Sequence, residues 1–250
     1  MTETLASTSA VILAAGSGSR MGKPVNKIFL DLGGVTILEH TLSLFATLTF
    51  IEEIVLVVST ADRPMLDERY GERLEELGVS RLATGGKQRI DSSRAGIEAC
   101  CATTEMILIH DAARPFPPAS AVETAARAAM EIGAAILAVP VQDTLKRSTG
   151  GRQIDETLPR ADLFRAQTPQ VFRRAVLLDA LRQAGEAQFT DDASLVEATG
   201  NPVALVPGHE HNIKITTPDQ LELARVIFQI ERNEHHESTT PSRAAHRDRL

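Results

Sequence analysis

Short runs of apolar residues alternate with longer amphipathic segments along most of this chain. Runs with the length and composition of buried strands occupy residues 10–15, 54–59, 80–83, 106–110, 134–139 and 203–206. Apolar positions at helical spacing predict helices at 37–48, 64–77, 90–102, 120–132, 174–184 and 218–230. Strands rich in Val, Ile and Leu that alternate with helices are typical of a mostly parallel sheet buried on both faces. The pattern therefore predicts an α/β fold with helices on both faces of the sheet.

Two of the predicted helices begin with a capping sequence. Ser120 and Glu123 have the spacing of a capping box, and so do Thr217 and Gln220. Pro218 stands at the first helical position of the second helix, where an N–H group would have no helical partner. We therefore expect both helices to start at these residues.

One stretch breaks the alternation of strands and helices. Residues 142–159 contain two β-compatible segments around Gly150 and Gly151, which predicts a hairpin. The stretch is too polar for the core, and two strands alone are barely stable in water. We therefore expect an arm at about 142–162 that a second subunit covers, which would make the protein a homodimer.

The two ends of the chain lack the pattern of the middle. We expect residues 1–8 to be flexible, residues 9–230 to form one folded domain, and the polar residues 231–250 to be a disordered tail. The N-terminus has no positively charged segment before its short apolar run, so we expect no signal peptide. No stretch approaches the ~20 apolar residues that span a membrane, and we expect no membrane partner.

Composition narrows the class of protein further. At 250 residues, with 43% hydrophobic and 24% charged residues, the chain suits one large soluble domain. A net charge of −7 argues against nucleic acid as a partner, and an anionic ligand would need locally concentrated cations. Cys100 and Cys101 are adjacent on a predicted helix and poorly placed to bridge each other. We therefore expect reduced thiols and a cytoplasmic protein.

The segment after the first predicted strand has the features of a phosphate site. Residues 11–15 lead directly into Gly16 and Gly18, which let the backbone turn sharply and bring its N–H groups against a ligand. Three cations follow in the same loop: Arg20, Lys23 and Lys27. Free amides and cations at the end of a strand favour a polyphosphate. A surface loop that is merely basic is the alternative.

Two better-known phosphate motifs do not fit this loop. A dinucleotide fingerprint needs a glycine where the chain has Met21, so a Rossmann oxidoreductase is disfavoured. A P-loop needs four residues between its glycines and a Ser or Thr after its lysine. Here three residues separate Gly18 from Gly22, and Pro24 follows the lysine.

Candidate chemistry gathers at the carboxyl ends of the predicted strands. Gly16 follows the first strand and residues 84–89 follow the third, while Asp111 follows the fourth and Asp143 the fifth. The carboxyl ends of parallel strands meet at one edge of a sheet, where ligands bind in open α/β folds. We therefore expect these residues to surround one site.

Two motifs at these strand ends have specific interpretations. Asp111 is suited to help hold Mg²⁺ beside a triphosphate, although an ion pair with Arg114 that closes a turn is an alternative. His110 is interpreted as a packing or hydrogen-bonding residue, because in-line phosphoryl transfer needs no imidazole. Gly85 and Ser92 can read the edge of a small base, or they can simply form a turn and the first turn of a helix.

Residues 13–27 resemble the signature loop LAAGxGxRMxxxxPK of nucleoside-triphosphate transferases, with Asn26 where that family usually has proline. Further motifs occur in the order typical of one branch of this family, the 2-C-methyl-D-erythritol 4-phosphate cytidylyltransferases. They are GGxxRxxS at 85–92, HDAARP at 110–115, PVxDTxKR at 140–147, LxRAQTPQxF at 163–172, TDDAS at 190–194 and NIKIT at 212–216. The resemblance covers residues 9–230 and implies a Rossmann-like sheet with a protruding dimerisation arm.

The resemblance also implies an activity and a set of site residues. The expected reaction transfers CMP from CTP to 2-C-methyl-D-erythritol 4-phosphate and releases pyrophosphate, with Mg²⁺ or another divalent cation as cofactor. The implied catalytic residues are Arg20, Lys27, Lys214 and, from a neighbouring subunit, Arg160. The implied CTP-binding residues are Ala14, Ala15, Gly16, Gly18, Gly85, Gly86 and Ser92. Asp111, Arg114, Thr144, Thr168 and Thr190 are implied to bind the polyol phosphate, with Asp111 also as a metal ligand.

Two alternatives remain beside this expectation. A ribitol-5-phosphate cytidylyltransferase would share the CTP loop and differ only in the polyol pocket. A non-catalytic CTP-binding protein would share the fold, although the intact charged residues Arg20, Lys27, Asp111 and Lys214 argue against it. Some relatives carry a fused cyclodiphosphate synthase, and because this chain ends in a short polar tail we expect that activity to be absent.

Overall fold

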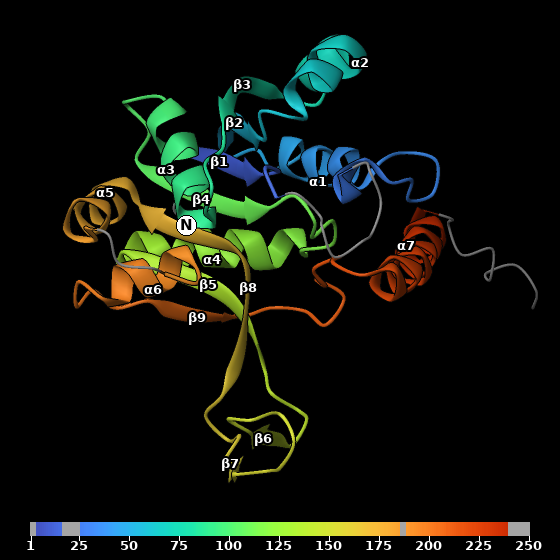
Figure 1. The fold of residues 1–250 in the computed structure, drawn as a ribbon. Helices are drawn as coiled ribbons and strands as arrows, with labels where there is room; N and C mark the ends of the chain where they lie inside the picture. Colours follow the sequence, from blue (N-terminus) through green and yellow to red (C-terminus); the bar gives the residue numbers. More distant parts are fainter. Residues whose placement is uncertain (1–3, 17–25, 186–188, 240–250) are drawn as a thin grey trace, which may run out of the picture.

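A seven-stranded sheet with helices on both faces forms the body of the protein (Figure 1). The computed structural model describes residues 4–16, 26–185 and 189–239, with side chains as far as residue 233. The strand order is β3-β2-β1-β4-β8-β5-β9. The strands are β1 (Thr8–Leu13), β2 (Ile51–Val58), β3 (Val79–Thr84), β4 (Met106–Asp111), β5 (Ala134–Pro140), β8 (Phe164–Arg173) and β9 (Ala204–Pro207). The α/β class and the six predicted strands are confirmed.

The hydrophobic pattern missed strand β8 and the short helix α6 (Asp192–Glu197). Strand β8 lies between β4 and β5 and runs antiparallel to both. Gln167, Gln170 and a proline interrupt its apolar run, and a central strand normally excludes proline. The two glutamines are buried nonetheless, because each finds hydrogen-bond partners in segments far along the chain. The sheet is therefore mostly parallel with one reversed strand.

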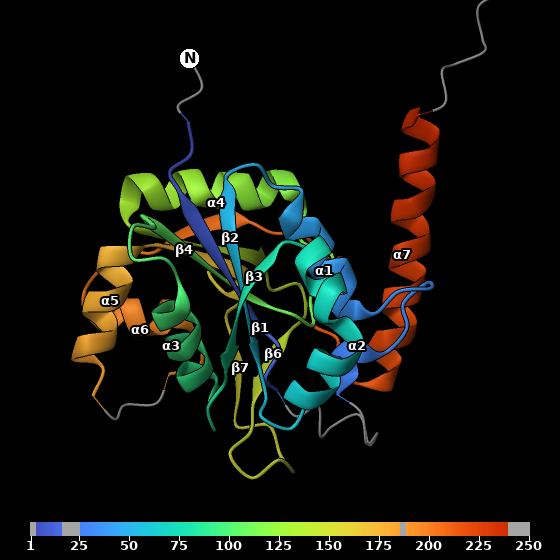
Figure 2. The ribbon, with the colours of Figure 1, turned by 90° about the horizontal axis from the view of Figure 1, so that it is seen from above.

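The helices divide between the two faces of the sheet (Figure 2). Helices α1 (Ile37–Ala46), α2 (Arg63–Glu76) and α4 (Ala119–Ile132) pack on the face that carries Ala10 and Ile12. Helices α3 (Arg89–Ala99), α5 (Arg174–Gln183) and α6 (Asp192–Glu197) pack on the face that carries Val11. Alternate residues of each strand thus enter two separate cores, which explains the continuous apolar runs.

The two predicted capping boxes had different outcomes. The box at the start of α7 (Pro218–Thr239) is confirmed, because Gln220 Oε1 accepts from the Thr217 N–H at 3.1 Å and Thr217 Oγ1 accepts from the Gln220 N–H at 3.4 Å. The box at Ser120 is wrong. Helix α4 starts at Ala119 after an N-cap Pro118 that makes no side-chain cap, so Ser120 lies inside the first turn.

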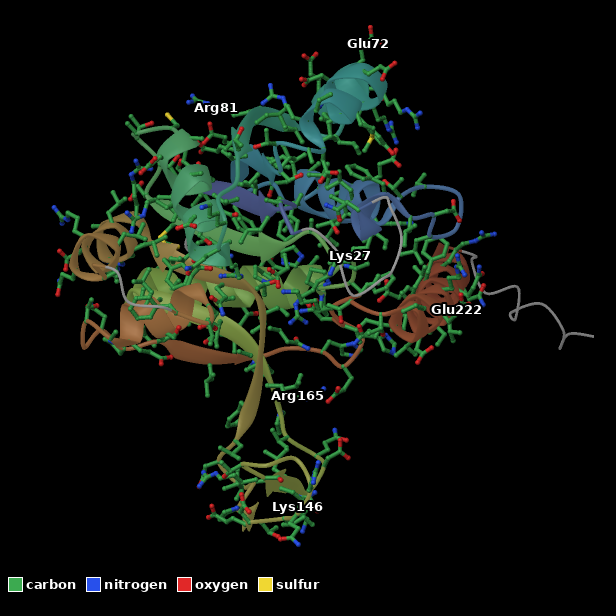
Figure 3. All side chains as sticks on the ribbon, in the orientation of Figure 1. Lys27, Glu72, Arg81, Lys146, Arg165 and Glu222 are labelled. Atoms are coloured by element: carbon green, nitrogen blue, oxygen red, sulfur yellow. The ribbon has the colours of Figure 1, made fainter. Side chains whose placement is uncertain are left out.

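The predicted hairpin is confirmed as an arm that projects from the body (Figure 1). Strands β6 (Leu145–Arg147) and β7 (Glu156–Leu158) pair antiparallel, with an ion pair of 2.7 Å between Arg147 and Glu156. Figure 3 shows Lys146 on the arm and Arg165 where the arm joins the body; there Arg165 pairs with Glu210 at 2.5 Å. The arm leaves from the end of β5 and returns as β8.

At both sides of the expected domain 9–230, the described residues continue its structure. Helix α7 extends nine residues past the expected boundary at 230, as far as Thr239. Extending a helix adds one hydrogen bond per residue without a new nucleus, so a polar segment can continue it. At the other end, Leu5 and Ala6 pack on the core and the Ser7 hydroxyl donates to Glu52 at 2.8 Å. None of the helices in the described ranges combines the length and the apolar character that crossing a membrane requires.

Candidate active site

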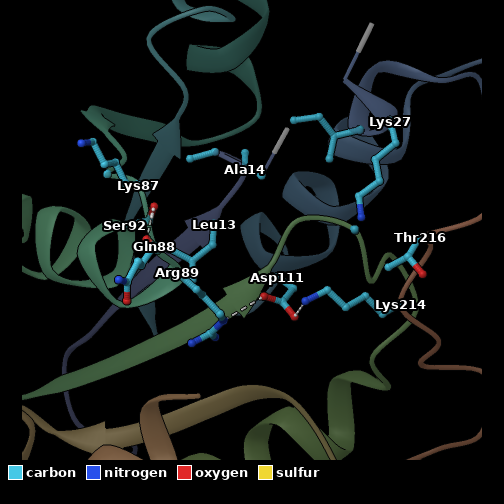
Figure 4. A pocket seen from close by; sticks show the side chains of 15 residues that line it. Leu13, Ala14, Lys27, Lys87, Gln88, Arg89, Ser92, Asp111, Lys214 and Thr216 are labelled. Carbon is cyan, nitrogen blue, oxygen red and sulfur yellow. Dashed lines mark hydrogen bonds and ion pairs between the residues drawn. The ribbon is translucent and has the colours of Figure 1, made fainter. Parts of the chain in front are cut away.

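A pocket of about 490 Å³ opens at the carboxyl edge of the sheet, beside the ends of β1 and β4 (Figure 4). Its side chains include the cations Lys27, Lys87, Arg89 and Lys214 and a single carboxylate, Asp111. The remaining lining residues are Leu13, Ala14, Ala15, Gly16, Ile28, Gly86, Gln88, Ser92, Ala113 and Thr216. A protein with a net charge of −7 thus concentrates positive charge at this edge. Such a pocket suits a polyphosphate.

Glycine is required where β3 meets the end of β1. A Cβ on Gly85 would lie 2.4 Å from the Cβ of Ala15 and 2.7 Å from Ser92 Oγ. The Gly85 N–H also donates to Val58 O at 2.8 Å, which fixes the backbone at this close approach. Gly85 therefore lies behind the pocket wall and positions Ala15 and Ser92, whereas Gly86 lines the pocket itself.

Lys27 reaches the pocket from the short 3-10 helix η2 (Lys27–Phe29). Its backbone oxygen accepts from the Leu30 N–H at 3.0 Å, which closes the single turn. The side chain is mostly buried, and Figure 4 shows Lys27 and Lys214 projecting into the same space from separate segments. Figure 3 places Lys27 near the middle of the body, well away from the arm.

A second pocket of about 260 Å³ adjoins the first and shares Arg89, Asp111 and Lys214 with it. Its other lining residues are Arg114, Ala166, Gln167, Thr168, Gln170, Thr190 and Asp191. The reversed strand β8 contributes four of these, so its polar residues form one wall of the pocket. The two pockets meet at three charged side chains.

Asp111 is surrounded by three cations at the junction of the pockets. Its Oδ2 lies 2.8 Å from Lys214 Nζ and 3.7 Å from Arg114 Nε, and its Oδ1 lies 3.5 Å from Arg89 Nε. Burial alone would raise the pKa of Asp111, but Lys214, Arg89 and Arg114 outweigh burial and hold the pKa well below its usual range. The carboxylate is therefore ionised at any physiological pH.

The position of Lys214 is set by its neighbours in the NIKIT segment. The buried Asn212 side chain donates to Thr168 O at 2.9 Å and to Gln167 Oε1 at 3.1 Å. The Ile215 N–H donates to Ala113 O at 2.9 Å. These bonds attach the segment to β8 and to the end of β4, so that Lys214 faces Asp111.

A chain of hydrogen bonds beneath the site fixes the tautomer of His110. Its Nε2 lies 2.8 Å from Arg114 O and must donate, so Nδ1 accepts from the Thr168 hydroxyl at 3.1 Å. Thr168 Oγ1 in turn accepts from the Asp111 N–H at 3.1 Å. Burial lowers the pKa of His110 to about 4, which keeps the ring neutral at neutral pH. This agrees with the structural role expected for His110.

Arg89 links the first pocket to helix α6. Its guanidinium pairs with the fully buried Asp192 at 2.5 Å while Nε faces Asp111. Gln170 Oε1 accepts from the N–H groups of Asp192 and Ala193, both at 3.1 Å, and so fixes the start of α6. The TDDAS segment is thereby held against the GGxxRxxS segment.

The expected role of Asp111 as a direct metal ligand does not fit this arrangement. Both of its oxygens face cationic side chains, which occupy the positions that a divalent ion would take. Over the described ranges 4–16, 26–185 and 189–233, no group of three His, Cys, Asp or Glu side chains could hold a metal ion. A divalent cation at this site would therefore depend on oxygens of the substrate.

The structure brings most of the predicted site residues together. Ala14, Ala15, Gly16, Lys27, Gly86 and Ser92 line the first pocket, Arg114, Thr168 and Thr190 line the second, and Asp111 and Lys214 line both. Thr144 and Arg160 are exposed on the arm and line neither pocket, while Gly18 and Arg20 lie outside the described residues. Sequence reasoning gave no role to Arg89, although its place in the GGxxRxxS motif, at the start of a helix, could have indicated one.

An open α/β sheet with a cationic pocket at the carboxyl ends of its strands, joined to a second pocket, fits a nucleoside-triphosphate transferase. The comparisons with known proteins specify which one. Residues 8–230 match the family described as 2-C-methyl-D-erythritol 4-phosphate cytidylyltransferase, and the chain belongs to this family.

Individual relatives carry the name of this family. The enzyme of that name from Syntrophotalea carbinolica is 43% identical over 221 residues, which are 87% of this chain and 94% of the relative. The one from Geobacillus kaustophilus is 41% identical over 88% of this chain and 96% of the relative. The crystal structure of the Thermus thermophilus enzyme superposes with a TM-score of 0.74 at 34% identity, covering 88% of this chain and 98% of that one.

Proposed function

We propose that this chain transfers CMP from CTP to 2-C-methyl-D-erythritol 4-phosphate, giving 4-diphosphocytidyl-2-C-methyl-D-erythritol and pyrophosphate, a step of non-mevalonate isoprenoid biosynthesis. One observation carries the proposal: the two pockets share Arg89, Asp111 and Lys214. A nucleotide in the larger pocket and a polyol phosphate in the smaller one meet at these side chains. The family assignment supplies the identity of the two substrates.

The chemistry follows from the charges of the two reactants. A phosphate oxygen of the polyol attacks the α-phosphorus of CTP, and pyrophosphate leaves from the opposite side. Both reactants are anions, so the protein must neutralise charge and align them. Lys27 lines the first pocket and Lys214 lines both, and we assign Arg20, which lies outside the described residues, to the same task. No general base is needed, because a phosphate monoester is already ionised near neutral pH.

Recognition of the polyol is assigned to the second pocket. Asp111 is a fixed, ionised acceptor, and so it suits the hydroxyl groups of the polyol rather than its phosphate. Arg114 and Thr190 line the same pocket and offer donors. Thr168 lines it too, with its hydroxyl proton already donated to His110 Nδ1. Cytidine is assigned to the wall formed by Ala14, Ala15, Gly16, Gly86 and Ser92.

Arg160 and Thr144 complete the site of a neighbouring subunit in this proposal. Both are exposed on the arm. The apolar side chains Ile154 and Phe164 are also exposed there, 64% and 47% respectively, which favours a partner over the arm. A homodimer in which each arm contacts the other subunit gives these side chains a cover and brings Arg160 to the second pocket of the partner.

The divalent cation is proposed to enter with CTP, bound to its phosphates. The family assignment supports a cation requirement, and the cationic surroundings of Asp111 favour phosphate oxygens over protein ligands. We also propose that the protein acts in the cytoplasm, where the free thiols Cys100 and Cys101 stay reduced.

A pyrophosphate-release assay with CTP, Mg²⁺ and 2-C-methyl-D-erythritol 4-phosphate tests the proposal. We expect turnover with this set, and little turnover when ATP replaces CTP, when ribitol 5-phosphate replaces the acceptor, or in excess chelator. Mass spectrometry of the product identifies the transferred group. Equal turnover with ribitol 5-phosphate would assign the chain to the other cytidylyltransferase activity, and CTP binding without any pyrophosphate release would indicate a non-catalytic protein.

A further inference from the structure

Asn26 stands immediately before Lys27, at a position where the signature loop usually has proline. The residue is buried, with 6% of its surface exposed, and all the hydrogen-bonding capacity of its side chain amide is directed to partners. Nδ2 donates to Ala14 O at 3.2 Å and to Asp62 Oδ2 at 2.9 Å. Oδ1 accepts from the Ile28 N–H at 3.4 Å and caps η2.

These bonds connect three segments that surround the first pocket. Ala14 lies directly after β1 and Asn26 directly before η2, so the bond between them joins two described parts of the signature segment 13–27. Asp62 is the N-cap residue of α2 and also accepts from the Ser59 hydroxyl at 2.7 Å. The segment that carries Lys27 is thereby attached both to the pocket wall and to the start of a helix.

We propose that Asn26 is a positioning residue that holds Lys27 against the α-phosphate of CTP through the Ala14–Asn26–Asp62 bonds. This rests on the role proposed for Lys27. The hydrogen bonds of Asn26 fix the backbone before Lys27, as the ring of a proline would fix it covalently. The backbone of Asn26 has φ −58° and ψ 132°, which a proline adopts without strain. The two residues are therefore alternative solutions to one requirement, a fixed backbone before the lysine.

The first test is a set of three substitutions at this position. We expect Asn26→Ala to lower kcat by about 10- to 100-fold with a smaller change in the KM for CTP, because a misplaced group costs rate more than ground-state binding. Asn26→Pro should restore most of the lost kcat. Asn26→Asp should be at least as slow as Asn26→Ala, since its carboxylate would face Ala14 O and the Asp62 carboxylate.

Ser59→Ala is the matched control. It removes two hydrogen bonds with Asp62 but leaves both donations from Asn26 in place, so kcat should be unchanged. The Asn26→Ala change should also have little effect when Lys27 is already alanine, because the positioned group is then absent. A merely structural role for Asn26 would lower kcat to the same degree in both backgrounds and would not be rescued by proline. Either result would overturn the proposal.

Hydrogen exchange of the residue 26–30 segment separates this inference from the role of Lys27. The Ile28 N–H donates to the Asn26 side chain, so Asn26→Ala should increase hydrogen exchange at this amide. Lys27→Ala should leave the exchange unchanged. If Lys27→Ala leaves kcat intact, the role of the lysine is wrong, whatever the exchange data show. If Asn26→Ala leaves both exchange and kcat unchanged, the positioning proposal is wrong.

Discussion

The neutral state of buried His110 predicts a specific dependence of stability on pH. Its pKa is lowered from 6.5 to about 4 by burial, so the unfolded chain takes up the proton at a higher pH than the folded protein. The stabilisation is therefore fully present above about pH 6.5 and is lost progressively as the pH falls toward 4. A shift of this size corresponds to about 3 kcal/mol in total, of which about 2 kcal/mol falls between pH 7.5 and pH 5.

Urea unfolding of the wild type and of His110→Gln at several pH values between 7.5 and 5 measures this contribution. Carboxylates contribute equally to both proteins, so the difference between their pH profiles isolates His110. We expect the wild type to lose about 2 kcal/mol more than the variant over this range, with unchanged m-values. Parallel profiles would refute the reasoning. If the variant does not fold, an NMR titration of the wild-type imidazole is decisive, because titration of His110 near pH 6.5 would contradict a buried neutral ring.

Three further predictions concern the site and the arm. Lys27→Ala should lower kcat by about 10²- to 10³-fold and raise the KM for CTP much less, because a preorganised charge acts mainly on the transition state; a change confined to KM would make Lys27 a ground-state binder. Gly85→Ala should destabilise the fold by about 1–3 kcal/mol in urea melts, since its Cβ would lie 2.4 Å from that of Ala15; unchanged stability would mean that the wall shifts freely. Inactive Arg160→Ala and Lys27→Ala proteins should regain about one quarter of wild-type activity when mixed, because half of the dimers would be mixed and each would hold one intact site. Subunit exchange without returning activity would contradict a shared site.

The regular elements of the fold were predictable because burial on both faces leaves a strong periodic signal. Six strands and six helices follow from this signal, and the capping box at Thr217 follows from residues only three positions apart. Strand β8 did not follow, because Gln167 and Gln170 are buried through partners at His209 and Asp191 that only the tertiary structure brings near. The local pattern of hydrophobic and polar residues cannot show that a polar side chain is buried when its hydrogen-bond partners lie far along the chain.

The location of the candidate site was predictable from the sequence, but most contacts among its side chains were not. Strand ends placed Gly16, Asp111 and the segment near Gly85 at one edge, as observed. The sequence offered the pair of Asp111 with Arg114, three residues away, but not the approach of Arg89 and Lys214, which come from distant parts of the chain. The contacts of Asn26 were not predictable for the same reason, because two of its three partners, Ala14 and Asp62, lie far along the chain and only Ile28 is local.

The reversed strand β8 has a mechanical consequence. At one end it forms the root of the arm, through Phe164 and Arg165, and in its middle it carries Thr168, which lines the second pocket and bonds to the Asp111 N–H. The arm and the second pocket are therefore connected by one strand, which pairs with β4 on one side and β5 on the other. Only three residues of β8 separate Phe164 at the root of the arm from Thr168 in the second pocket, so we expect contacts made on the arm to affect substrate binding in that pocket.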